Sequence, residues 1–306
     1  MVDGDKPSIS LVVVAYNMAR ELPRTMASLL PPIQRGTDEI DYELIVVDNG
    51  SAQPVPASDD DRIKLIRIDD ASPSPARAAN AGLERARGDL IGVLIDGARI
   101  ASPGLIQHAT LADRLHHRPV IASLGFHLGP DIQMRSVHQG YDRATEDALL
   151  ASSDWEQDGY RLFSISSFAG SSDGGWFAPV AESNALFLRR EMWNELGGYD
   201  EQFASPGGGF VNLDAFARAC DLEHSQLIIL LGEGTFHQVH GGVATNALES
   251  PGDQFRAEYL AIRGRPFTRP DHDRVYLGRL RPEVMASIRD SAAHTAKGPG
   301  KNLMES

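Results

Sequence analysis

Three short polar segments in the first hundred residues directly follow apolar runs. They are Ala15-Tyr16-Asn17, Asp48-Asn49-Gly50-Ser51 and Asp96-Gly97-Ala98-Arg99. Their carboxylate, amide and guanidinium groups can bind the base, ribose or phosphates of a nucleotide, or a cation beside those phosphates. For Asp48 and its neighbours an ordinary turn is the alternative, because these residue types favour turns in any protein.

The apolar runs before these segments have the composition of buried parallel strands. They cover residues 9–14, 43–47, 63–68 and 90–95, with amphipathic stretches of helical spacing at 18–30 and 75–86. Alternation of strand and helix predicts an α/β protein with a doubly wound, mainly parallel sheet. Ligands of such sheets bind beyond the carboxyl ends of the strands, so the three polar segments are expected at one edge.

The later part of the chain changes character twice. A helix at 103–117 and a strand at 120–126 are followed by residues 129–175, which lose periodicity and gain Trp, Tyr, Ser and Gly. We interpret that stretch as an inserted irregular lobe or set of loops. Regular patterns then return, and they predict a strand at 185–189, helices at 190–196 and 213–219, and a strand at 226–231.

Composition excludes several classes of protein. The 306 residues are 42% hydrophobic, enough for one large domain or two joined lobes, and the formal net charge of −13 disfavours nucleic acid as a partner. The single Cys220 excludes an internal disulfide framework, and no charged and then apolar leader opens the chain. The longest apolar runs are far below the roughly 20 residues of a transmembrane helix. These features predict a cytoplasmic protein without a transmembrane segment.

Two common nucleotide-binding motifs are absent. The turn after the first strand, residues 16–20, contains no glycine, whereas a dinucleotide fingerprint needs glycines for close approach to the pyrophosphate. A Walker-type phosphate loop is also missing. A dehydrogenase and a P-loop protein are therefore disfavoured, as is a nucleotidyltransferase, which would carry a glycine-rich basic stretch at this point.

Four segments, taken in order and spacing, resemble the signatures of family 2 glycosyltransferases. They are Val12 to Asn17, Leu44 to Ser51, Ala76 to Leu83 and Ala86 to Asp96, and a weaker match covers residues 184–201. The resemblance implies a GT-A (nucleotide-diphospho-sugar transferase) fold. Residues 1–128 would form the nucleotide-sugar-binding half and 129–250 the acceptor-side and catalytic half, with a C-terminal helical extension and tail at 251–306.

The same resemblance assigns roles on the donor side. Ala15, Tyr16 and Asn17 would line the nucleotide pocket, and Asp48 would accept hydrogen bonds from the base or ribose. Arg77 and Asn80 would flank the donor phosphates or sugar, while a solvated helix residue is the alternative for Arg77. Gly82 would allow close packing of its helix.

The sequence departs from the family at the expected metal site. The usual Asp-X-Asp reads Asp96-Gly97-Ala98, so the second carboxylate is missing. The sequence predicts that Asp96 and His240 hold Mn²⁺ or Mg²⁺ together with the donor diphosphate. His237 is expected to be a structural hydrogen-bonding residue. The alternative is that Arg99 supplies the positive charge in place of a cation.

A second departure concerns the catalytic base that an inverting transfer requires. Asn212 stands where the family has the acid, and an amide cannot accept the proton. Asp214 and Glu182 are the two candidates for the base. For Glu182 a simple surface charge is the alternative.

Aromatic residues are concentrated in the irregular middle of the chain: Trp155, Tyr160, Phe163, Trp176 and Phe177. They form either an acceptor platform or the small core of that lobe. Because specificity commonly resides in loops on a rigid scaffold, we expect residues 129–175 to set acceptor choice.

The function that follows is transfer of a sugar from a nucleoside-diphosphate sugar to an unidentified acceptor, metal-assisted and inverting. A carbohydrate, a lipid-linked molecule or a small molecule would serve as acceptor. The alternative is a non-catalytic nucleotide-sugar-binding protein of the same fold, because the second Asp and the usual base are both missing.

Overall fold

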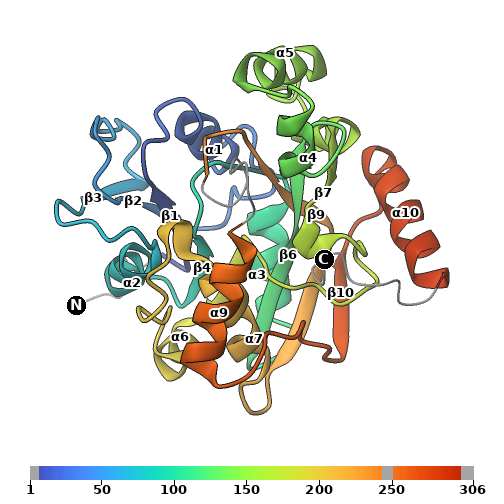
Figure 1. Cartoon of the computed structure of the whole chain (residues 1–306). Helices are drawn as coiled ribbons and strands as arrows, with labels where there is room; N and C mark the ends of the chain where they lie inside the picture. Colours follow the sequence, from blue (N-terminus) through green and yellow to red (C-terminus); the bar gives the residue numbers. More distant parts are fainter. Residues whose placement is uncertain (1–6, 243–250, 298–306) are drawn as a thin grey trace.

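The computed structural model describes residues 7–242 and 251–297 (Figure 1). Within them, ten strands form one sheet in the order β10-β9-β6-β8-β4-β1-β2-β3, while β5 pairs with β9 and β7 pairs with β6. The predicted α/β class is confirmed. The division of the chain at residues 128 and 250 stays a prediction.

The N-terminal part follows the sequence prediction closely. Strands β1 (Ile9–Ala15), β2 (Tyr42–Asp48), β3 (Ile63–Arg67) and β4 (Leu90–Leu94) are parallel neighbours. Helix α2 (Ala76–Arg85) matches its predicted range, and α1 (Leu22–Ser28) is shorter than predicted. A Cβ at Gly82 would lie 2.2 Å from Val12, so this glycine does allow close packing of α2 on β1.

The second part of the sheet brings distant segments together. Strand β6 (Pro119–Leu128) runs parallel to β9 (Gln226–His237), and β8 (Leu186–Arg189) is antiparallel to both β4 and β6. Strand β9 was predicted to stop at residue 231. It continues because the register with β6 shifts between Ala122 and Leu124, and Gly232 adopts a positive φ of 83° at that shift. The short strand β5 (Arg99–Ala101) pairs with this continuation and places Arg99 opposite His237.

Residues 129–175 are more regular than predicted. They contain α4 (Gln133–His138), α5 (Arg143–Ser153), a 3₁₀ helix at Gly159–Ile165, the strand β7 (Ser166–Phe168) and a 3₁₀ turn at Gly170–Ser172. The buried side of α5 consists of Glu146, Leu150 and Ser153. Because two of these three residues are polar, hydrophobic periodicity gives no signal for this helix.

The C-terminal part is not only helical, which corrects the prediction for residues 251–306. Between α9 (Gly252–Arg263) and α10 (Met285–Ala296), the edge strand β10 (Arg274–Gly278) joins the sheet parallel to β9, and a 3₁₀ turn follows at Pro282–Val284. The tail predicted from Ala293 begins later, since α10 continues to Ala296. Residues 298–306 lie outside the described part.

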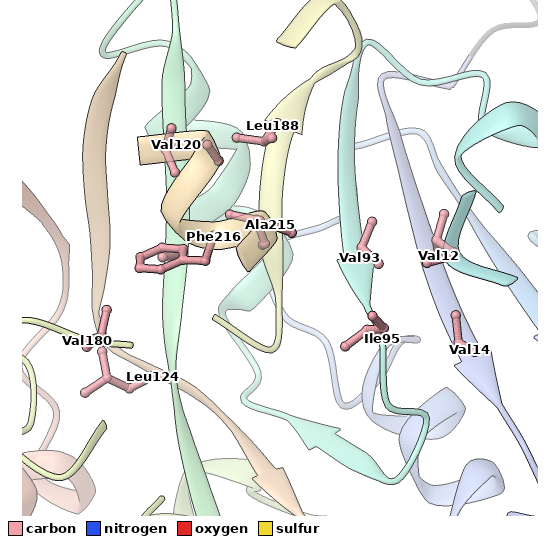
Figure 2. Close-up of a cluster of buried hydrophobic side chains, with 14 of the residues drawn as sticks. Val12, Val14, Val93, Ile95, Val120, Leu124, Val180, Leu188, Ala215 and Phe216 are labelled. Atoms are coloured by element: carbon pink, nitrogen blue, oxygen red, sulfur yellow. The ribbon is translucent and has the colours of Figure 1, made fainter. Parts of the chain in front are cut away.

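Alternating side chains of the sheet pack into two cores. On one face, Val12 and Val14 share a cluster with α2, α6 (Arg190–Leu196) and α7 (Val211–Cys220), part of which Figure 2 shows. On the other face, Leu11 and Val13 pack with α1 and α3 (Leu105–Asp113). In the part of the chain that the structure describes, no helix has the length and apolar character needed to cross a membrane.

The aromatic residues of the irregular middle of the chain belong mainly to this core. Trp155, Tyr160, Phe163 and Trp176 are buried, and Trp176 donates its indole N–H to the carbonyl of Leu230 at 3.1 Å. Phe177 is half-buried and packs edge-on against Tyr276. Core is therefore the correct alternative for the four buried rings, and an acceptor platform made of them is wrong.

Candidate functional site

The loops after β1 and β2 meet at the carboxyl edge of the sheet, as predicted. Ala15 and Asp48 are register partners. The Asn17 backbone N–H donates to Ser51 Oγ at 2.9 Å, and Asn17 Oδ1 accepts the N–H of Ala52 at 2.9 Å. Tyr16 projects from this joined loop with 55% of its surface exposed. An exposed ring on a fixed loop is a surface on which a nucleotide base can stack.

Asp48 is buried beneath that loop rather than directed at an open pocket. Its carboxylate accepts the backbone N–H groups of Ser51 at 2.8 Å and Val55 at 3.1 Å and pairs with Arg67 at 2.6 Å. Burial opposes ionisation, but hydrogen bonds from the side chain and backbone of Ser51, from Val55 and from Arg67 lower the pKa of Asp48. Protein donors engage both oxygens and the side chain is buried, so it does not face an open pocket, and its contact with a nucleotide stays a prediction.

A second group of residues gathers around Asp96, just beyond β4. His237 Nε2 lies 2.9 Å from Asp96 Oδ2, and His240 Nε2 lies 3.7 Å from Asp96 Oδ1 and 3.1 Å from His237 Nε2. His240, which the sequence predicted to be a metal ligand, does lie close to Asp96. His237, expected to be structural, is the nearer histidine, and the continuation of β9 past Gly232 brings it there.

The electrostatics of this cluster suit a cation. Burial opposes ionisation of Asp96, but the two histidines and Arg99 hold its pKa well below the usual range. Burial lowers the pKa of His237 to about 4, although Asp96 opposes the shift. Near neutral pH, Asp96 is thus an anion and His237 a neutral imidazole, which are the forms that bind metals.

The donor set fits Mn²⁺ or Mg²⁺. The three ligand atoms of Asp96, His237 and His240 all lie within 4.8 Å of one another. Adjacent ligands of an octahedral ion with bonds of about 2.1 Å are separated by roughly 3 Å. One carboxylate and two imidazoles favour Mn²⁺ over Mg²⁺, since nitrogen ligands suit the softer ion.

Arg99 lies against the same cluster. The side chain is buried, with Nε 3.5 Å from Asp96 Oδ2, and neither Nε nor Nη1 has a hydrogen-bond partner among the described residues. A buried guanidinium with unsatisfied N–H groups is costly unless an anion completes its hydrogen bonds. The three candidate cation ligands and Arg99 therefore lie side by side.

Glu182 and Asn212, which the sequence places on the acceptor side, are in direct contact. Asn212 Nδ2 donates to Glu182 Oε2 at 2.7 Å, and Asn184 Nδ2 donates to Glu182 Oε1 at 3.2 Å. A Cβ placed at Gly125 would lie 3.5 Å from Asn184 Nδ2 and 3.7 Å from Arg99 Nη1. Gly125 therefore lies between the Glu182 group and the Asp96 cluster, within van der Waals distance of a residue of each side.

Asp214 does not have the surroundings of a general base, which corrects its assignment. It is buried on α7, where Arg263 contacts both carboxylate oxygens at 2.6 and 2.7 Å and Arg218 contacts Oδ2 at 2.7 Å. Both oxygens of this carboxylate are therefore occupied by guanidinium donors, and neither is directed at an acceptor hydroxyl. Its role is to tie α7 to α9.

Arg77 and Asn80 do not join the cluster either. Arg77 is exposed and donates to the carbonyl of Asp70 at 3.1 Å, so the solvated alternative fits it. Asn80 exchanges hydrogen bonds with the backbone of Tyr199 at 2.8 and 2.9 Å and donates to Glu201, which corrects its assignment to the donor phosphates. Asn80 lines a cavity of about 390 Å³ with Arg218 and Arg263, and no residue of the Asp96 cluster lines that cavity.

Comparison with known proteins agrees with the sequence motifs. Residues 10–109 match the family described as Glycosyl transferase family 2, a range that contains the four signature-like segments. The resemblance found in the sequence is confirmed over that range. No curated protein matches the sequence.

Solved structures of S. aureus TarS are similar at 13% identity. One covers 83% of this chain and 40% of that chain with a TM-score of 0.47. S. aureus TarS 1-349 in complex with UDP-GlcNAc covers 83% of this chain and 66% of that chain with a TM-score of 0.48. This chain therefore spans less than two thirds of the length of each.

Proposed function

We propose that this chain, which its residues 10–109 identify as a family 2-like glycosyltransferase, transfers one sugar from a nucleoside diphosphate to an acceptor hydroxyl. One observation carries the proposal. A metal-ligand set of Asp96, His237 and His240 lies beside Arg99, which has buried and unsatisfied N–H groups, at the nucleotide edge of the sheet. A divalent cation and a guanidinium together suit a diphosphate leaving group.

On the donor side, the exposed Tyr16 ring would stack on the base, and the loop joined by Asn17 and Ser51 would hold it in place. Asp96, His237 and His240 would hold Mn²⁺ or Mg²⁺, and the bound ion would offset the charge on the diphosphate. Arg99 would donate Nε–H and Nη1–H to phosphate oxygens. Arg99 and His237 are themselves buried, whereas Asp96 and His240 keep part of their surface exposed.

On the acceptor side, Glu182 is the proposed base. The acceptor oxygen would bond to the anomeric carbon while the bond from that carbon to the diphosphate breaks, and the hydroxyl proton would pass to Glu182. The contact with Asn212 supports this role, because it puts a carboxylate beside the amide that replaces the usual acid. Attack from the face opposite the leaving group would invert the configuration of the anomeric carbon.

A non-catalytic nucleotide-sugar-binding protein is the second candidate, and Asn212 at the base position favours it. Turnover separates the two functions. A binding protein would bind the donor with Mn²⁺ yet neither transfer nor hydrolyse its sugar, whatever the acceptor.

The experiment is a screen of UDP-, GDP- and dTDP-sugars by thermal shift with and without Mn²⁺, followed by hydrolysis and transfer assays on the best donor. We expect EDTA to abolish turnover and Mn²⁺ to restore it. Asp96→Ala and His237→Ala should raise the metal concentration needed, whereas the exposed Arg77→Gln control should not. Full turnover in EDTA that is lost on Arg99→Ala would overturn the metal assignment and leave the cationic role to Arg99.

A further inference from the structure

Gln133 brings the inserted stretch into contact with the metal-ligand set. It is the first residue of α4, its side chain is buried, and its Oε1 is hydrogen-bonded to Nδ1 of His237. This contact lies on the side of the imidazole away from Nε2, which faces Asp96. Residues 129–175, expected to set acceptor choice, therefore also reach the donor side of the site.

The position of Gln133 is itself fixed by a third histidine. The Gln133 backbone N–H donates to Nδ1 of His127 on β6 at 2.7 Å, and the His127 ring lies 5.4 Å from that of His237. A backbone amide can only donate, so His127 Nδ1 must be the acceptor. This bond ties the start of α4 to the sheet beside His237.

We propose that Gln133 is a positioning residue that holds His237 as the Nδ1–H tautomer, so that the Nε2 lone pair is presented to a cation shared with Asp96 and His240. A carbonyl oxygen only accepts, so His237 Nδ1 must carry the proton in this contact. The Nε2 lone pair then lies 2.9 Å from an Asp96 oxygen and 3.1 Å from His240 Nε2. Three electron-rich atoms at these distances repel one another unless a cation or a proton lies among them. The inference rests on the metal site of the proposed function.

Contacts that do not involve Gln133 hold the backbone at Val239 and His240 in place. Glu146 on α5 accepts the Val239 N–H at 2.9 Å, and Arg143 donates to the His240 carbonyl at 3.0 Å. Arg20 donates to the Val239 carbonyl at 3.2 Å. Since none of these contacts involves Gln133, replacing its side chain should change the His237 tautomer while the loop stays in place.

The test combines two measurements on the full chain. Nitrogen-15 NMR of labelled histidines reports which imidazole nitrogen carries the proton in the metal-free protein, and electron paramagnetic resonance gives the Kd for Mn²⁺. Gln133→Met removes the acceptor oxygen, and Gln133→Asn moves it away from His237 by shortening the side chain by one methylene. Gln133→Glu retains an acceptor oxygen in place. Arg135→Gln, on the same helix with an exposed side chain, is the matched control.

We expect the Nδ1–H tautomer of His237 in the wild type, Gln133→Glu and Arg135→Gln. The Met and Asn variants should populate the Nε2–H tautomer and bind Mn²⁺ about 10-fold more weakly. This is the lower end of the loss in metal affinity that follows when a ligating histidine loses its hydrogen-bond partner. Substitution by Met or Asn that leaves both the tautomer and the Kd unchanged would overturn the inference. Absence of Mn²⁺ binding in the wild type would refute the metal proposal instead, while the NMR spectra would still decide the tautomer.

Discussion

The assignment of Glu182 as the base can be tested with the nearly isosteric Glu182→Gln variant. Two side-chain amides, from Asn212 at 2.7 Å and Asn184 at 3.2 Å, donate to the Glu182 carboxylate. Glutamine keeps one acceptor oxygen, but its new NH₂ group faces an amide donor. The folded protein should therefore lose about one charge-assisted hydrogen bond, on the order of 1.5–3 kcal/mol of stability.

The effect on catalysis should be larger. A positioned general base contributes roughly 10²–10⁴ in rate, or about 3–5 kcal/mol of the activation free energy. The kcat for transfer should fall by that factor. The Kd for the nucleotide should be unchanged, because none of the Glu182 contacts described above involves the Asp96 cluster.

The matched variant exchanges the two groups. In Glu182→Gln with Asn212→Asp, the carboxylate and amide of one contact are swapped, so part of the lost kcat should return. The assay measures kcat for transfer at saturating donor and the nucleotide Kd by calorimetry. If Glu182→Gln transfers sugar at the wild-type rate, the base is another residue and the reasoning from the Asn212 contact fails.

Three other predictions follow from the buried charges. Asp214→Asn should lower the free energy of unfolding by about 1.5–3 kcal/mol in urea denaturation, because Arg218 and Arg263 lose a shared charged partner while Arg263 keeps Asp200; unchanged stability would contradict a structural role. Asp48→Ala should lower the melting temperature and cost about 3 kcal/mol of the free energy of unfolding, because the turn at Ser51 loses its hydrogen-bond acceptor. A variant that is as stable as the wild type but binds nucleotide more weakly would instead mean that Asp48 faces ligand. The pKa of His237 falls from 6.5 to about 4 on folding, so the unfolded chain binds more protons between these values. The contribution of neutral His237 to the free energy of unfolding, up to about 3 kcal/mol, is present above pH 6.5 and is lost as pH falls toward 4. Over that range the metal-free wild type should lose more stability than His237→Gln. Equal dependence of the free energy of unfolding on pH in the two proteins would count against the lowered pKa of His237.

The sequence by itself determined the N-terminal half of the fold and the edge of the sheet on which the candidate site lies. Strands β1, β2 and β4 are buried on both faces, so each appears as a continuous apolar run that ends in polar residues. The order of strand, helix and motif is a local property, and it fixed the positions of Asn17 and Asp96 relative to the sheet.

Only the tertiary structure decided which polar residues have partners. Asp214 and Glu182 are both acids in plausible positions, but Asp214 is bound by Arg263, which lies 49 residues further along the chain. The donors that contact the Glu182 carboxylate within the described part of the chain are the neutral amides of Asn212 and Asn184. Nothing local in the sequence distinguishes them, because ion pairing depends on which helices pack together.

The same holds for the metal-ligand set. His237 reaches Asp96 because a register shift beside Gly232 lets β9 run six residues past its predicted end. Gln133 reaches His237 across 104 positions of sequence, from a helix whose buried side is too polar to show periodicity. Hydrophobic patterns record burial of apolar side chains, whereas these contacts are made by buried polar groups that only the folded chain brings together.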